Sequence, residues 1–203
     1  MREPSIKGIA ITQLIEDVRG FRDRSLEGRH DVEACVNAAG LALLDEKIEP
    51  ATWYPIEAYQ SLTRFLWERE GHGSVEYLRR RGAASAERVL DAGIYQQIEF
   101  LRERYGTSDR ANLARDLKLV VTLQGAFFNF TTWQAASDPD HADRLQIEIR
   151  DAEHFPEEIC HATAGFVTQI AAQVRASGLQ WYPERPRPDL VILRMDRRAT
   201  FLK

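Results

Sequence analysis

Cysteine, long apolar runs and targeting signals are scarce in this sequence. Only two cysteines occur among 203 residues, Cys35 and Cys160, and their spacing matches no metal-binding motif. This usage favours a reducing compartment, with a disulfide between the two residues as the alternative. No apolar run approaches the ~20 residues that a membrane-spanning helix needs, and the first residues lack the apolar core of a signal peptide. We therefore expect a cytoplasmic protein that does not enter the membrane.

Charge of one sign is never concentrated in a long block. The chain has 27 basic and 31 acidic residues, with a formal net charge of −4. Nucleic-acid binding needs a clustered basic face that contacts phosphates, so we do not expect nucleic acid as the main partner. The densest basic run is Arg79-Arg80-Arg81, which we interpret as a solvated helix end.

Catalytic and metal-binding motifs are missing as well. Gly71-His72-Gly73 lacks the preceding strand and the lysine of a phosphate-binding loop, and no Gly-x-Ser-x-Gly nucleophile motif occurs. His154 and His161 would share one helix face if the helix began early. Pro156 instead suggests that His154 precedes the helix, where solvent-facing or capping histidines are the alternative to a metal pair. We expect no metal site and no enzymatic activity.

The first half of the chain has the apolar spacing of helices. The first helix is indicated by one apolar face, formed by Ile11, Leu14, Ile15 and Val18. A second helix is expected over residues 31–39, with Gly40 as its C-cap. Further helices are expected over residues 56–69, 75–81, 85–105 and 113–124, with a loop over 48–55 and a break at Gly82.

The second half changes to the alternating pattern of strands. Two extended runs, 127–133 and 145–149, predict a hairpin. The remaining elements are a helix over 156–177 and strands over 179–184 and 190–195, with a turn over 185–189. The predicted fold is α+β, with an N-terminal helical half and a ββαββ half that forms an antiparallel sheet. We expect a helical subdomain over residues 1–108 and a helix plus ββαββ subdomain over 109–203, packed as one globular unit.

Asp116 stands out in the helix over 113–124, because it lies on the apolar side between Leu113 and Val120. A buried carboxylate needs a partner, and an arginine from residues 102–104 is one interpretation. The other is a general acid or base whose pKa is raised by burial. No nucleophile, metal site or oxyanion-binding group accompanies it, so we rank the enzymatic interpretation last.

Aromatic residues gather directly after this helix, at Phe127, Phe128, Phe130 and Trp133. Such a cluster can form the core between a strand and the helices, or it can line a ligand pocket. Core packing is the more common role, and we favour it here.

Six or so helices followed by ββαββ is the element order of the haem nitric oxide/oxygen binding (H-NOX) domains, and short motifs extend this resemblance. Ile6-Lys7-Gly8 resembles the Met-Lys-Gly start of that family. Asp116-Leu117-Lys118-Leu119 stands where the family carries His-Leu-x-Leu, at the same spacing before Gly125-Ala126. The family's Tyr-x-Ser-x-Arg motif, counted back from Gly165, falls on residues 149–153.

This resemblance implies an H-NOX-like fold in which the haem contacts are replaced. Asp116 occupies the position of the histidine that holds the iron, and an aspartate supplies no imidazole nitrogen. Ile149, Asp151 and Glu153 stand where tyrosine, serine and arginine bind the propionates, and the two acids would repel those groups. We therefore expect no haem and no other cofactor.

Two further resemblances are narrower. The segment Pro50 to Pro55, which contains Trp-Tyr-Pro ahead of an amphipathic helix, is similar to an uncharacterised paralogous family of myxobacteria and relatives. Those proteins resemble haem-free members of the same superfamily. The helix start from Cys160 to Gly165 resembles that of the 4-vinyl-reductase-like small-molecule domains. Their cysteine cluster is missing here, so zinc is not implied.

The resulting functional prediction is a non-enzymatic sensory or regulatory module that has lost the haem site. It would bind another small-molecule ligand or a signalling protein. The candidate pocket residues are Asp116, Val120, Phe127, Ile149, Asp151 and Glu153. The alternative is a haem-binding gas sensor that uses His154 or His161 as a non-standard iron ligand.

Overall fold

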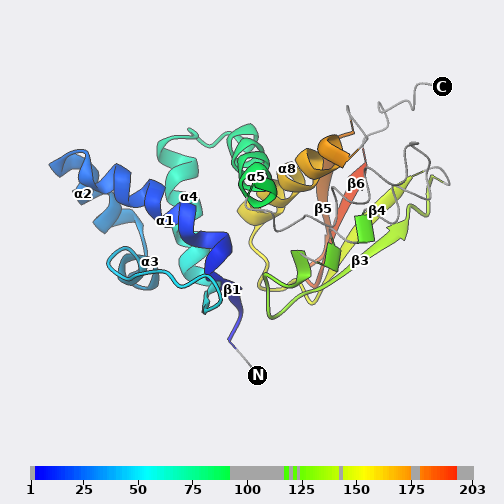
Figure 1. Cartoon of the computed structure of the whole chain (residues 1–203), viewed down its shortest axis with the longest axis horizontal. Helices are drawn as coiled ribbons and strands as arrows, with labels where there is room; N and C mark the ends of the chain where they lie inside the picture. The colour runs from blue at the N-terminus through cyan, green and yellow to red at the C-terminus, as the bar shows by residue number, and fades with distance from the viewer. Residues whose placement is uncertain are drawn as a thin grey trace.

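The computed structural model describes residues 3–91, 117–118, 121–122, 124–141, 144–174 and 179–195. Its helices are α1 (Gly8–Asp23), α2 (Leu26–Cys35), α3 (Ala38–Leu43), α4 (Ile56–Arg69), α5 (Val75–Asp91) and α8 (Glu157–Val174). Its strands are β1 (Ser5–Lys7), β2 (Trp53–Pro55), β3 (Thr132–Ser137), β4 (Leu145–Arg150), β5 (Trp181–Arg187) and β6 (Leu190–Met195). Figure 1 shows α1 to α4 at one end of the molecule, the four-stranded sheet at the other, and α5 and α8 between them. The predicted subdomain boundary after residue 108 lies outside the described residues.

Helices α1 and α4 form the apolar centre of the helical end. The buried large side chains of α1 are those whose spacing indicated one face: Ile11, Leu14, Ile15 and Val18. Helix α4 has the predicted bounds, and it buries Leu62, Phe65 and Leu66. Among the helices that the structure describes, none is long and apolar enough to cross a membrane.

The helix predicted over residues 31–39 is wrong in its bounds. Helix α2 begins earlier, because Ser25 caps it: the Ser25 Oγ accepts a hydrogen bond of 2.9 Å from the Gly28 N–H. Helix α3 begins after Asn37, whose Oδ1 accepts a hydrogen bond of 2.7 Å from the Gly40 N–H. Gly40 therefore lies in the first turn of a helix and is not a C-cap.

The short strands β1 and β2 form an antiparallel pair at the edge of the helical end. The loop predicted over residues 48–55 is therefore wrong for its last three residues. Strand β1 also contacts the chain that leads into the large sheet. The Lys7 N–H donates a 2.9 Å hydrogen bond to the Phe127 carbonyl, and Ile6 forms an isolated bridge with Phe128. The N-terminal strand thus connects the two halves of the molecule.

The large sheet has the strand order β3-β4-β6-β5, and all neighbouring strands are antiparallel. The predicted ββαββ order, and with it the α+β fold class, is confirmed. In β4 the side chains of Leu145, Ile147 and Ile149 point to one face and are buried, as the alternating pattern predicts. Helix α8 contacts β5 and lies along the sheet (Figure 1).

Two strand bounds differ from the prediction. Strand β3 begins at Thr132, so the strand predicted over residues 127–133 is wrong for most of its length. Strand β5 continues through Arg187, so only Pro188 and Asp189 form the turn that was expected over residues 185–189.

Gly82 does not interrupt the chain, contrary to the prediction. Helix α5 runs without a break through this position and crosses α8 there. A Cβ atom at Gly82 would lie 1.8 Å from the Ala162 carbonyl oxygen, and one at Gly165 would lie 2.0 Å from that of Arg79. The two glycines let the helix backbones approach directly. As a result, α5 and α8 have the most extensive contact of any pair of described elements.

Substitution of Gly82 by alanine tests this crossing. At an open helix position the same change stabilises a protein by up to ~1 kcal/mol. At Gly82 the backbone clash reverses the sign, and we expect the free energy of unfolding to fall by about 1–3 kcal/mol, as at other overpacked sites. Urea denaturation measures the change. Gly20→Ala in α1 is the matched control, because a Cβ there meets nothing within 4 Å and should stabilise. Equal effects of the two substitutions would contradict the tight crossing.

Candidate functional site

Two adjoining cavities lie where α1, α4, α5 and α8 meet the aromatic segment at residues 127–128. The larger one, here called the helical cavity, has a volume of about 240 Å³. The smaller one, the aromatic cavity, has a volume of about 60 Å³. The residues that line both are Ile9, Ala10, Tyr59, Gly82, Ser85, Val89 and Ala162. Because α8 belongs to the sheet half and the other helices to the helical half, the cavities lie at the junction of the two halves.

The aromatic cavity is bounded mainly by apolar side chains. The residues that line this cavity but not the helical cavity are Ile6, Gln124, Phe127, Phe128, Ile159, Thr163 and Phe166. Phe128 stacks on Trp133 with ring centroids 6.0 Å apart, and it meets Phe155 edge-on at 5.1 Å. The predicted aromatic cluster packs as core, and Phe127 and Phe128 also line the aromatic cavity. Its role in a ligand pocket stays a prediction.

Gln124 is one of the residues that line the aromatic cavity. It is 5% exposed, and its Nε2 has no hydrogen-bond partner among the described residues. The backbone carbonyl of Gln124 accepts a 3.0 Å hydrogen bond from the backbone N–H of Phe127. This bond closes the turn that brings Phe127 to the cavity. Buried amide donors in proteins normally have an acceptor. Gln124 is the last residue of the helix expected over residues 113–124, and no sequence pattern reveals an unpaired donor there.

The helical cavity has a polar side formed by α1 and α5. Arg81 Nη2 donates to Asp17 Oδ2 at 2.5 Å, and Gln13 Nε2 donates to the same carboxylate at 2.9 Å. Arg88 also lines the cavity; it is exposed, and none of the described residues forms an ion pair with it. Burial raises the pKa of Tyr59, so its phenol stays protonated at neutral pH and remains a hydrogen-bond donor.

The interpretation of residues 79–81 as a solvated helix end is wrong for two of the three arginines. Arg79 is 9% exposed, and its Nη1 donates a 2.8 Å hydrogen bond to the Trp181 carbonyl. Its guanidinium also lies over the Tyr182 ring, 4.7 Å from the centroid. Arg81 is half-buried beside the helical cavity. Both residues lie inside α5 because this helix continues beyond them.

The structure describes four of the six predicted pocket residues and places them in different surroundings. Phe127 is half-buried and lines the aromatic cavity. Ile149 is buried in β4, whereas Asp151 and Glu153 are exposed after the end of that strand. None of these three lines either cavity. Asp116 and Val120 lie outside the described residues, so a site that combines all six positions stays a prediction.

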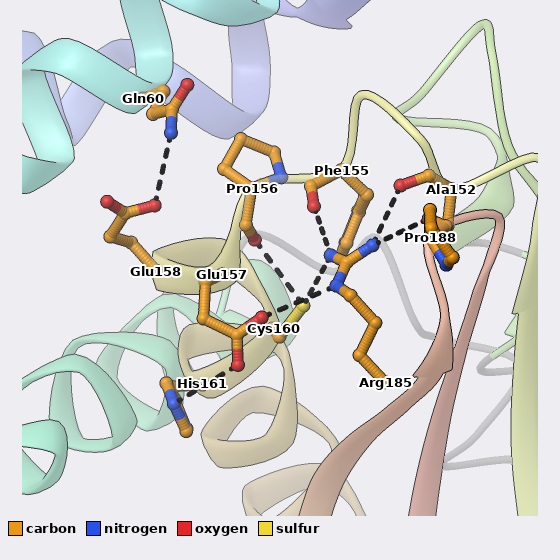
Figure 2. A network of polar contacts seen from close by, with 10 residues as sticks. All are labelled: Gln60, Ala152, Phe155, Pro156, Glu157, Glu158, Cys160, His161, Arg185 and Pro188. Carbon is orange, nitrogen blue, oxygen red and sulfur yellow. Dashed lines mark hydrogen bonds and ion pairs between the residues drawn. The ribbon is translucent and has the colours of Figure 1, made fainter.

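Arg185 donates hydrogen bonds to the backbone of the segment after β4, at Ala152 and Phe155, as Figure 2 shows. Its guanidinium donates hydrogen bonds of 3.0 Å to the carbonyls of Ala152 and Pro188, and a further one to the Phe155 carbonyl. One planar guanidinium thus donates to three backbone carbonyls. The compact ammonium group of a lysine would not reach all three as well. The sequence gives no indication of this role, since Arg185 meets these carbonyls only in the folded chain.

Replacement of Arg185 tests this role. Arg185→Met leaves the three carbonyls without their donor, and we expect the free energy of unfolding to fall by about 2–4 kcal/mol. Arg185→Lys keeps the charge but not the planar group, so it should restore only part of the loss. Urea denaturation measures both. Arg187→Met is the matched control, because Arg187 pairs with Asp189 at the surface and should change stability by less than ~1 kcal/mol. A loss at Arg185 no larger than this control would contradict the assignment.

The two cysteines are free, with Cys35 exposed and Cys160 buried. Burial raises the pKa of the Cys160 thiol to about 12, so almost none of it is thiolate at neutral pH. We expect Ellman's reagent to modify one thiol in the native protein and the second only after unfolding. In Cys35→Ser the fast reaction should disappear. Rapid modification of two thiols in the native protein would show that Cys160 is accessible.

His154 and His161 lie in separate environments. His154 is exposed in the turn before α8. The His161 Nε2 on α8 lies 3.8 Å from Glu157 Oε1, and burial lowers the pKa of His161. Neither histidine lines the helical or the aromatic cavity. Within the described ranges, no group of three or more His, Cys, Asp or Glu side chains is arranged to hold a metal ion.

Comparison with known proteins identifies the fold. No protein-family model and no curated protein matches the sequence. The H-NOX protein from S. oneidensis in the Fe(II)NO ligation state has 12% identity and a TM-score of 0.53, over 94% of this chain and 98% of that one. The Fe(II) unliganded H-NOX protein from K. algicida has 14% identity and a TM-score of 0.53, over 97% and 100%. A mutant of the H-NOX protein from T. tengcongensis has 13% identity and a TM-score of 0.52, over 94% and 97%.

These similarities extend over nearly the whole of each chain, at low sequence identity. They establish that the chain has an H-NOX-like fold, as the element order and the short motifs had predicted. The ligand and the activity need separate arguments, because one fold can carry many functions.

Proposed function

We propose that this chain is a non-enzymatic sensory or regulatory module that binds a small molecule other than haem at the junction of its two halves. The observation that carries the proposal is the position of the two cavities, whose walls come from both halves. A ligand held there contacts α1 and α5 on one side and α8 on the other. Its binding energy therefore depends on how the halves are packed, which is the requirement for coupling occupancy to conformation.

The described residues around the cavities favour a ligand other than haem. Haem iron in sensor proteins is held by an axial ligand such as histidine, and no histidine lines either cavity within the described residues. A cavity of roughly 150 Å³ accommodates benzene. The volumes of about 240 and 60 Å³ are therefore small for a four-ring macrocycle. Asp151 and Glu153 add negative charge where the resemblance would place the haem propionates.

The alternative of a haem sensor that uses His154 or His161 has less support. His154 is exposed, and His161 lies beside Glu157 without lining either cavity. An iron held by either residue would lie away from the apolar walls that shield haem. We therefore propose a small ligand other than haem, and the experiment below must exclude haem binding.

The absence of enzymatic activity is also a proposal. Ser85 is a hydroxyl-bearing residue that lines both cavities, but no histidine or carboxylate lines them with it among the described residues. Without a base next to the hydroxyl, the nucleophile would not be activated. Signal output would instead require a protein partner, which we propose to be a signalling protein in the cytoplasm.

Reconstitution with hemin tests the haem-free proposal. The purified chain is incubated with excess hemin, desalted and measured by absorption spectroscopy. We expect no stoichiometric complex and no Soret band of a ligated haem protein, because no axial ligand lines the cavities within the described residues. His154→Ala and His161→Ala are the matched variants. A stoichiometric Soret band in the parent chain would refute the proposal, and its loss in one variant would identify the iron ligand.

A further inference from the structure

The charged side chains that line the helical cavity all carry positive charge. The lining includes Arg81 and Arg88, and no aspartate, glutamate or histidine among the described residues. Both arginines belong to α5, and Ser85 of the same helix also lines the cavity. Positions 81, 85 and 88 are separated by four and then three residues, which places side chains on one face of a helix. One face of α5 therefore brings two cations and a hydroxyl group to this cavity.

The two arginines differ in how their charge is compensated. Arg81 Nη2 lies 2.5 Å from Asp17 Oδ2, so the charge of Arg81 is paired within the protein. Arg88 forms no ion pair with any residue in the described part of the chain. The adjacent Glu87 instead accepts a 2.9 Å hydrogen bond from Gln169 of α8. Arg88 thus supplies a positive charge that an anionic group on a ligand would pair with.

The side chain of Arg88 is exposed, which makes an anion tolerable at this position. A carboxylate beside it would keep contact with water, so it would avoid most of the cost of burying a charge. Tyr59 lines the same cavity. Burial raises the pKa of Tyr59, and the charges of Arg81 and Arg88 oppose that rise. Both guanidinium groups therefore act on a phenol that stays protonated and can donate a hydrogen bond.

The remaining walls and the volume indicate the size of the ligand. Apolar side chains of the lining include Ile9, Leu14, Leu78 and Val89, and such walls supply most of the binding energy for small molecules. The volume of about 240 Å³ exceeds the roughly 150 Å³ that holds benzene. The helical cavity therefore has room for one six-membered ring and a small polar group.

We propose that the helical cavity binds a compact organic anion, with one apolar ring inside the cavity and one carboxylate beside Arg88. This inference rests on the proposed function, because it specifies the ligand of the same site. It assigns Arg88 as the residue that selects an anion over a neutral molecule of the same shape. Tyr59 and Ser85 are neutral hydrogen-bonding groups in the same lining.

Three probes of similar size test the proposal by chemical-shift titration of the whole isotope-labelled chain at neutral pH. Benzoate is an anion, benzamide is its neutral analogue, and benzylamine is a cation. We expect benzoate to bind about 3–10-fold more tightly than benzamide, because a charge-assisted pair at a partly solvated site adds a modest gain. Benzylamine should bind most weakly. High salt should weaken the binding of benzoate and leave that of benzamide unchanged.

Two variants with the same change in net charge test the role of Arg88. Arg88→Gln removes the cation and keeps a polar side chain, so the ratio of benzoate to benzamide affinity should fall close to one. Arg80→Gln is the matched control, because Arg80 is exposed on the same helix and lines neither cavity. It should leave the ratio unchanged. Both positions are exposed, so both variants should fold like the parent chain.

The outcomes separate the anion from the small-ligand function. The amide signals of Gly82, Ser85 and Val89 should move on binding, because these residues line the cavity. If the parent chain binds benzamide as tightly as benzoate, or if the ratio in Arg88→Gln equals that in Arg80→Gln, the inference is refuted while the proposed function stands. If no probe moves the signals of the cavity residues in the parent chain, both the inference and the proposed function are refuted.

Discussion

Backbone contact between α5 and α8 at Gly82 and Gly165 is the constraint on which the arrangement of the two halves depends. A side chain at either glycine would overlap a carbonyl of the opposite helix. The added Cβ atom would lie only 1.8 Å (Gly82) or 2.0 Å (Gly165) from that carbonyl oxygen. The contact is reciprocal, since each helix supplies one glycine and one carbonyl. Helix α8 also contacts β5, and α5 continues the helical end, so this crossing holds the sheet and the helices together.

Polar groups from both halves reinforce the crossing. Arg79, one turn before Gly82, reaches across to the Trp181 carbonyl in β5. Arg64 of α4 donates a 2.7 Å hydrogen bond to Glu158 of α8, whose side chain is buried. Such a buried carboxylate is tolerated because it is paired and hydrogen-bonded. Gly82 also lines both cavities. The glycine that lets the two helices approach therefore also forms part of the cavity wall between the halves.

We propose that this H-NOX-like scaffold has lost the haem chemistry and keeps a junction at which another ligand can bind. The predicted counterpart of the H-NOX propionate motif falls on the end of β4 and the turn after it. Ile149 is core there, and Arg185 donates hydrogen bonds to the Ala152 and Phe155 carbonyls of that turn. The cavities lie instead against the start of α1 and the aromatic segment. Apolar walls of this kind give affinity for small molecules, and the few polar groups among them determine which molecule binds.

Local sequence patterns determined the fold class and much of the element order. The bounds of α4 and β6 and the buried face of β4 follow from apolar periodicity, because burial of one face requires that spacing. The replacement of the haem motifs stays a prediction from the resemblance. Tertiary structure alone decided that Gly82 is a crossing point, that Arg79 is buried, and that the Gln124 amide has no described partner. Periodicity identifies which face of a helix or strand is buried. The residues that pack against that face come from distant parts of the chain, so periodicity does not identify them.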